Sequence, residues 1–89
     1  MDSRDFLALV REKVADRFNE RFGLHMPGER KEPGEVFIVW SSKVLKNNKA
    51  LAAVDGGNGM YYEVTYNGET NELYIDEYVK SKNVKIVVN

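Results

Sequence analysis

The sequence has no cysteine, only one histidine and only two prolines among its 89 residues. The absence of cysteine excludes a disulfide framework and thiolate chemistry, and it fits a reducing compartment such as the cytoplasm. One histidine and no EF-hand spacing of acids provide no ligand set for zinc or calcium. We therefore expect no metal and no cofactor, and we interpret His25 as a loop residue rather than a ligand or catalyst.

Long hydrophobic runs are also missing. No apolar run exceeds five residues, the length of the run from Val36 to Trp40, whereas a membrane-spanning helix needs about 20. The first five residues, MDSRD, lack the basic and then apolar plan of a secretory signal. These patterns predict a cytoplasmic protein that does not bind a membrane.

Neither sign of charge dominates, because 13 basic and 14 acidic side chains give a net charge of −1. DNA-binding proteins usually carry a basic surplus, since phosphate neutralisation supplies much of their affinity. The charges are nevertheless segregated: residues 55–79 contain six acids and no lysine or arginine. This distribution indicates either alternating solvated faces with lysines at strand edges or an acidic recognition surface with a basic rim. The flanking lysines are Lys43, Lys46 and Lys49 before this stretch and Lys80, Lys82 and Lys85 after it.

The composition, 43% hydrophobic and 30% charged, is typical of one folded domain over residues 1–89. Residues 3–22 are predicted to form an amphipathic helix, because apolar side chains recur at every fourth position. Asp2 or Ser3 is placed to cap its start, and Gly23 to end it in a left-handed conformation. The expected core stripe consists of Phe6, Val10, Val14, Phe18 and Phe22, with Leu7 and Ala15 beside it.

A loop over residues 23–34 and an antiparallel sheet over residues 35–88 are predicted to follow, giving an α+β fold with four or five strands. The expected strands are 35–42, 50–54, 60–66, 72–79 and 83–88, with a turn at 46–49; a helical turn over 42–51 is the alternative for the second of these. The run from Val36 to Trp40 is apolar on both faces, which favours a central strand or a partner that covers the second face.

Two glycine-containing turns divide the remaining strands. Residues 56–59 (GGNG) precede a strand rather than a helix, so a hairpin connection is favoured over a phosphate-binding loop. Asn67-Gly68 is a strong hairpin signal. The alternation across this hairpin predicts that Tyr62, Val64, Tyr66, Leu73 and Ile75 share one face, and that Tyr61, Glu63, Thr65, Tyr74, Asp76 and Tyr78 share the other.

The second of these faces is the candidate interaction surface. Tyrosine suits interfaces, because it combines a large contact area with a hydroxyl group. Interleaved acids indicate a basic protein partner or self-association, whereas single-stranded nucleic acid requires cations. Paired carboxylates such as Glu63 and Asp76 could act in acid–base catalysis, but a chain this small rarely builds the necessary pocket, so no catalytic residue is predicted. The candidate residues are Trp40, Tyr61, Glu63, Tyr74, Asp76 and Tyr78.

The segments VWSSKVLKNNKAL and MYYEVTYNGETNELYIDEY, within residues 39–78, resemble a family of short uncharacterised proteins encoded by phages and prophages of Gram-positive bacteria. The resemblance implies a cytoplasmic protein in an infected or lysogenic host cell. It implies no activity and no site residue.

The sequence thus predicts a small non-enzymatic interaction module: a phage accessory protein that binds a host protein or self-associates as a homodimer. The alternative is nucleic-acid binding at a lysine-rich sheet edge. That alternative requires five lysines to converge, namely Lys43, Lys46, Lys49, Lys80 and Lys82.

Overall fold

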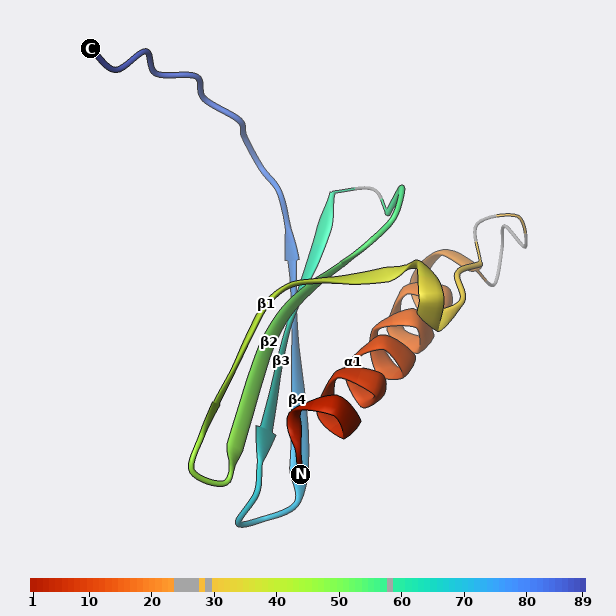
Figure 1. Cartoon of the computed structure of the whole chain (residues 1–89). Helices are drawn as coiled ribbons and strands as arrows, with labels where there is room; N and C mark the ends of the chain where they lie inside the picture. The colour runs from red at the N-terminus through yellow and green to blue at the C-terminus, as the bar shows by residue number, and fades with distance from the viewer. Residues whose placement is uncertain (24–27, 29, 58) are drawn as a thin grey trace.

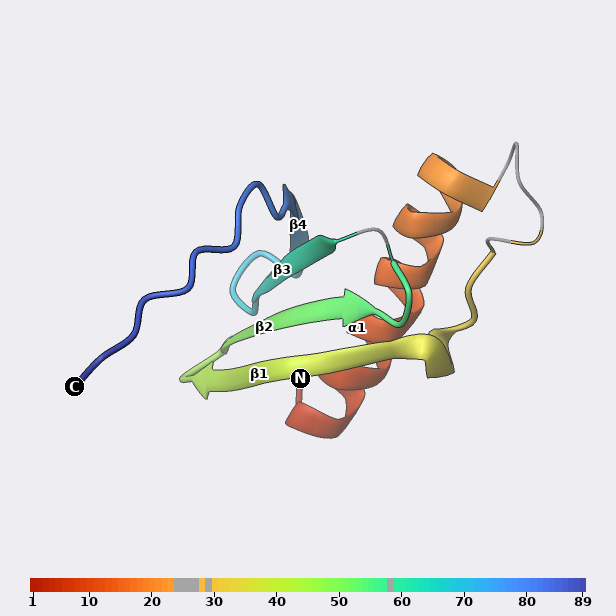
Figure 2. The same ribbon diagram turned by 90° about the horizontal axis from the view of Figure 1, so that it is seen from above.

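A computed structural model describes residues 1–23, 28, 30–57 and 59–89. One helix packs on one face of a four-stranded antiparallel sheet, which confirms the α+β fold (Figures 1 and 2). Each strand pairs with the next strand along the chain, so the sheet order is β1-β2-β3-β4. The strands are β1 (Val36–Val44), β2 (Asn47–Val54), β3 (Met60–Asn67) and β4 (Glu72–Val79).

The N-terminal helix follows the predicted pattern. Helix α1 spans Ser3–Phe18, and Asp2 caps it by accepting a hydrogen bond from the Asp5 N–H at 2.8 Å. The helical path continues through a π-helical turn, η1 (Asn19–Gly23). Gly23 is not among the residues with positive φ, so the predicted left-handed stop is wrong. A Cβ at Gly23 would lie 2.8 Å from the Arg30 Cγ, so glycine makes room for the returning chain.

The hydrophobic core lies between α1 and the inner face of the sheet. The predicted stripe is confirmed: Phe6, Val10, Val14 and Phe18 are buried, and the partly buried Phe22 packs against them. Inward-facing positions of β2 carry the small residues Ala50 and Ala52, both fully buried, which lets the helix approach the middle of the sheet. Larger side chains from β3 complete the core: Met60, Tyr62, Val64 and Tyr66.

The β1 strand corrects two predictions. It pairs only with β2 and is therefore an edge strand rather than a central one. The expected turn at residues 46–49 lies earlier, at Leu45 and Lys46, so residues 47–49 already belong to β2. The alternative of a helical turn over residues 42–51 is also wrong. The double-sided apolar pattern of β1 arises from a β-bulge between Ile38 and Trp40.

The predicted last strand at residues 83–88 is not formed. Within the described part of the chain the sheet ends at Val79, so its extent is 36–79 rather than 35–88. Residues 80–89 carry no assigned secondary structure and are exposed throughout. Their apolar side chains match a strand pattern, but no strand of the described residues pairs with them.

The glycine-containing connection between β2 and β3 joins two antiparallel strands, as predicted. Gly56 and Gly59 have φ values of 68° and 72°, the left-handed region in which glycine carries little steric cost. Asn58 lies outside the described residues, and so does His25 in the predicted loop over 23–34. That loop ends in a short 3₁₀ turn, η3 (Pro33–Glu35), which leads into β1.

Candidate functional site

The face of the sheet opposite α1, here called the outer face, is built from three cross-strand rows. Antiparallel residues that lie directly opposite each other point to the same side of a sheet. Each row takes one residue from every strand in the order β1 to β4. The rows are Phe37–Ala53–Tyr61–Tyr78, Trp40–Leu51–Glu63–Asp76 and Ser42–Lys49–Thr65–Tyr74.

All six candidate residues therefore lie on the outer face. Tyr61 stands opposite Tyr78, and Glu63 stands opposite Asp76, as the alternation across the hairpin predicted. Trp40 lies in the same row as the two acids, on the far edge strand. The structure brings these residues onto one face.

Sequence alternation missed Phe37 as a member of this face. Phe37 and Trp40 are three positions apart, and a regular strand would direct them to opposite sides. The bulge between Ile38 and Trp40 inserts one unpaired residue and shifts the alternation. Both aromatic rings consequently lie on the outer face, where their residues are 50% and 44% exposed. Only the unusual apolar run hinted at this irregularity.

Aromatic residues thus stand half-exposed on this face without cover from the rest of the chain. Tyr74 and Tyr78 are 52% and 50% exposed. A half-exposed tyrosine or tryptophan retains much apolar surface that binding could remove from water. Because they come from both edge strands, the aromatic residues frame the acids of the middle row.

The acids in the middle row are incompletely compensated. Glu63 and Asp76 are directly opposite each other, an arrangement in which like charges destabilise a sheet. Lys49 offsets part of this repulsion, since its Nζ lies 3.3 Å from the Glu63 Oε1. Within the described residues, Asp76 forms no ion pair. The face therefore offers a negative site between aromatic side chains.

A shallow hollow lies at the turn end of the outer face. Its volume is about 200 Å³, too small and open to enclose a substrate. The hollow extends the outer face toward the β1–β2 turn and makes this end of the face concave. It is lined by Ser42, Val44, Asn47, Asn48, Lys49 and Thr65.

The structure does not gather the five lysines proposed for nucleic-acid binding. Lys43, Lys46 and Lys49 lie around the β1–β2 turn, at one edge and one end of the sheet. Lys80 and Lys82 follow β4, which is the opposite edge, and Val79 pairs with Met60 at the other end of the sheet. The described residues therefore do not meet the condition on which that alternative depended.

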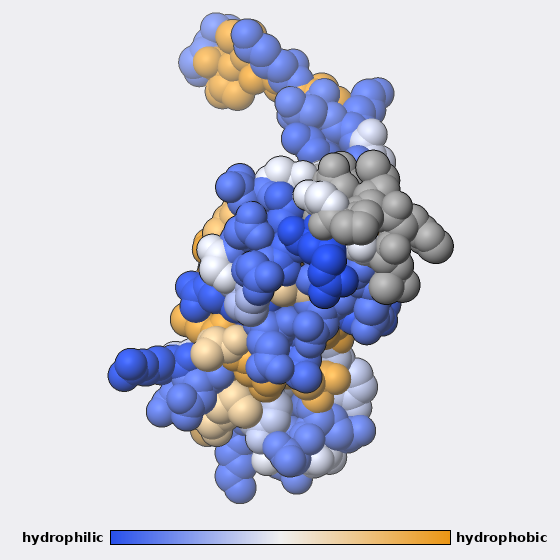
Figure 3. Space-filling view, turned by 90° about the vertical axis from the view of Figure 1, so that its right-hand side faces the viewer, coloured by the Kyte–Doolittle hydropathy of each residue, from blue (hydrophilic) through white to orange (hydrophobic). Residues whose placement is uncertain are grey.

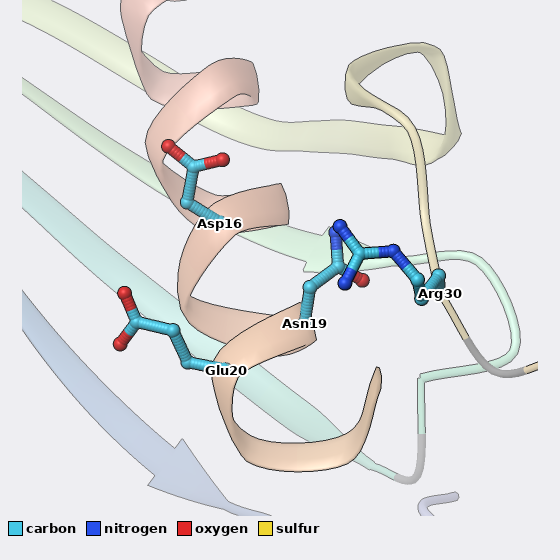
Figure 4. A pocket seen from close by; sticks show the side chains of 4 residues that line it. All are labelled: Asp16, Asn19, Glu20 and Arg30. Carbon is cyan, nitrogen blue, oxygen red and sulfur yellow. The ribbon is translucent and has the colours of Figure 1, made fainter. Parts of the chain in front are cut away.

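A second hollow, of about 230 Å³, lies between α1 and the chain that returns to the sheet (Figure 4). The helical side of the hollow is lined by Asp16, Asn19 and Glu20. Arg30 lines the opposite side and belongs to the returning chain. Two of the hollow's polar groups already have partners: Glu20 accepts a hydrogen bond from Arg17 at 2.8 Å, and the Asn19 amide is bonded to Lys31. We interpret it as a structural junction.

Tyr62 and Glu77 form a polar pair beneath the helix on the inner face. They are opposite each other, and the Tyr62 hydroxyl and the Glu77 Oε1 are buried without a hydrogen-bond partner. Burial raises the pKa of Tyr62, and the nearby charge of Glu77 raises it further. Arg17 donates to the Glu77 Oε2 at 3.0 Å, and this hydrogen bond raises the pKa of Arg17. Neither Tyr62 nor Glu77 lines either of the two hollows.

The described ranges contain no group of three or more histidine, cysteine, aspartate or glutamate side chains placed to hold a metal ion. No helix in the described part of the chain combines the length and the apolar character needed to cross a membrane.

Residues 7–88 match the family described as "Family of unknown function (DUF6275)", so the chain belongs to this family. The match includes α1 from Leu7 onward, all four strands and most of the segment after β4. Neither the search of curated proteins nor the search of solved structures found a match.

Proposed function

We propose that this DUF6275 protein is a small non-enzymatic interaction module that binds another protein on the outer face of its sheet. One observation carries this proposal: α1 covers only the inner face, and aromatic residues from both edge strands remain half-exposed on the other. Exposed aromatic side chains gathered on one face beside polar groups often mark an interface. The side of the molecule on which α1 lies is mostly hydrophilic, by contrast (Figure 3).

The charges of the face define the chemistry of the partner. Glu63 and Asp76 oppose each other and only Glu63 has a cation beside it. An arginine or lysine from a partner would pair with Asp76 and would relieve the repulsion between the two carboxylates. The neighbouring rings would exclude water from that pair, as the rim of an interface does around its central contacts. The partner surface is therefore basic and apolar.

The biological setting stays a prediction. The resemblance to phage and prophage proteins implies an accessory protein in the cytoplasm of a bacterial host, where the partner is a host protein or a second copy of the chain. A self-complementary face would produce a two-fold symmetric dimer without a second gene product.

The test compares substitutions on and off the outer face. Trp40→Ser and Tyr74→Ala remove aromatic area, and Asp76→Lys reverses the unpaired charge. Leu45→Asn is the matched control, because Leu45 is 89% exposed at the β1–β2 turn, away from the rows. Capture of host proteins should weaken for the three face variants and remain unchanged for the control. Self-association through the outer face, measured by sedimentation equilibrium at micromolar concentration, should follow the same pattern. Circular dichroism verifies that each variant is folded.

A strictly monomeric protein whose Trp40 and Tyr74 variants still capture every host protein that the wild type captures would contradict the proposal. Equal losses for Leu45→Asn would also count against it, since binding would then not depend on the outer face.

A further inference from the structure

The chain continues past β4 as an extended segment that leads away from the domain on the side opposite α1 (Figures 1 and 2). This segment, residues 80–89, contains four β-branched apolar residues and is exposed along its whole length. The projecting end is visibly hydrophobic (Figure 3). The exposures of Val84, Ile86, Val87 and Val88 are 62%, 77%, 79% and 86%. Such residues favour strands and normally pack on a neighbour.

The preceding strand offers a free edge. Strand β4 pairs with β3 alone, and the pairing reaches one residue further because the Lys80 N–H donates to the Gly59 carbonyl oxygen at 3.0 Å. The other side of β4 presents unpaired backbone groups along eight residues. An open edge of this kind is a template for an added strand from another chain.

The segment and the edge carry opposite charges. Residues 80–89 contain three lysines and no acid, whereas residues 69–79 contain four acids and no lysine or arginine. The β1 edge offers the segment no such attraction, because the one charged residue of β1 is Lys43. Charge complementarity thus favours the β4 edge over the β1 edge.

We propose that residues 80–89 of one chain add as a fifth strand to the β4 edge of a second copy, and that the second copy returns its own segment in the same way. The paired strands run antiparallel about a two-fold axis at Ser81. In this register Lys85 faces Glu77 of the partner subunit, whose Oε1 has no hydrogen-bond partner among the described residues. The apolar residues also match, since Val87 faces Ile75 and Val84 faces Tyr78 across the two copies.

The exchange satisfies the backbone groups that the single chain leaves unpaired. Each copy gains a strand of about the length of β4, because both segments advance about 3.3 Å per residue. The register has one cost: Lys80 of each copy lies near Lys82 of the other. Moderate ionic strength screens this repulsion. The DUF6275 match extends to residue 88, so the family domain includes most of the segment.

This inference goes beyond the proposed function, because it assigns the backbone edge of β4 rather than the outer face. The two can therefore fail separately. Trp40 lies on β1, at the opposite edge of the sheet, so substitutions there leave the strand exchange intact.

The test is a disulfide trap in a chain that has no cysteine of its own. In an antiparallel pair of strands, a cysteine at the symmetry axis lies opposite the same cysteine of the second copy, within disulfide range. Ser81→Cys should therefore form a covalent dimer on mild oxidation at micromolar concentration and moderate ionic strength. Asn89→Cys is the matched control, because Asn89 faces Leu73 of the partner subunit in this register and the two cysteines are far apart. It should oxidise to dimer at least about tenfold more slowly than Ser81→Cys, since only random collisions bring its thiols together.

Two backgrounds separate this inference from the proposed function. Val87→Pro on the Ser81→Cys chain should abolish the dimer. The Lys80 N–H is bonded to β3, so the alternate residues Ser81 and Val87 direct their backbone groups to the second copy, and the substitution removes one of these donors. Val87 is 79% exposed and makes no contribution to the core. Trp40→Ser on the same chain should leave the dimer unchanged. Equal oxidation rates for Ser81→Cys and Asn89→Cys, or a dimer that survives Val87→Pro, would overturn the strand exchange.

Discussion

Asn19 and Lys31 are joined by two hydrogen bonds that tie the end of the helix to the chain returning toward the sheet. The Asn19 Nδ2 donates to the Lys31 carbonyl oxygen at 2.8 Å, and the Lys31 N–H donates to the Asn19 Oδ1 at 2.7 Å. The asparagine amide thus pairs with both backbone groups of one residue, as a neighbouring strand would. Asn19 is buried, so water competes little for these bonds.

Asn19→Ala should lower the free energy of unfolding by about 2 kcal/mol, because two hydrogen bonds are lost and two backbone groups lose their partners. Urea denaturation monitored by circular dichroism measures the change. Asn47→Ala is the control: its side chain accepts one hydrogen bond, from the Gly68 N–H at 3.2 Å, at an exposed position. An equal or smaller loss for Asn19→Ala than for Asn47→Ala would contradict this role.

Phe18→Ala should cost about 3–5 kcal/mol, as for other large buried aromatic residues. Phe18 is fully buried and its ring centroid lies 4.8 Å from that of Phe22. Phe37→Ala removes the same side chain from the half-exposed outer face and should cost only about 1 kcal/mol. Thermal melting of both variants measures the contrast; comparable melting temperatures would show that the helix stripe is not the core.

Tyr62→Phe should leave stability at neutral pH unchanged or raise it by about 1 kcal/mol, because the buried hydroxyl has no partner and its burial costs about 1–3 kcal/mol. The substitution should also change the alkaline behaviour. The raised pKa of Tyr62 means that the unfolded chain loses this proton first.

The stability linked to Tyr62 is therefore complete below the ordinary tyrosine pKa of 10.0 and is lost as pH rises through the raised pKa of the folded state. Urea unfolding at neutral pH and at alkaline pH above 10.0 measures the loss of unfolding free energy. Tyr62→Phe should reduce it, while Tyr74→Phe on the exposed face should behave as the wild type. Identical alkaline losses in the two variants would rule out Tyr62 as the source.

Gly68→Ala should destabilise the domain by about 1–3 kcal/mol, in the range of overpacking. A Cβ at Gly68 would overlap the Lys46 carbonyl oxygen and lie 2.7 Å from the Lys46 Cβ, so the two hairpin turns would separate. Gly34→Ala is the matched control, since a Cβ there meets nothing within 4 Å. Chemical denaturation of both variants tests this contrast, and a neutral Gly68→Ala would show that the turns do not require contact.

The sequence by itself determined the elements that depend on local periodicity. The four-residue spacing of Phe6, Val10, Val14 and Phe18 identified the helix and the side of it that is buried. The alternation around Asn67-Gly68 identified both faces of the β3–β4 hairpin, whereas the pairing of Asn67 with Glu72 across the turn at residues 68–71 came from the structure. These features follow from side-chain direction along a helix or a strand, which neighbouring residues fix.

Only the tertiary structure decided the features that depend on strand order and irregular backbone. The apolar run of β1 favoured a central strand, whereas β1 lies at the edge of the sheet. Its bulge between Ile38 and Trp40 directs both aromatic rings to the outer face. Residues 83–88 have strand propensity, but propensity supplies no neighbour, and the described chain leaves them unpaired. The physical reason is that a strand exists only through hydrogen bonds to another strand, and local sequence does not specify which chain provides it.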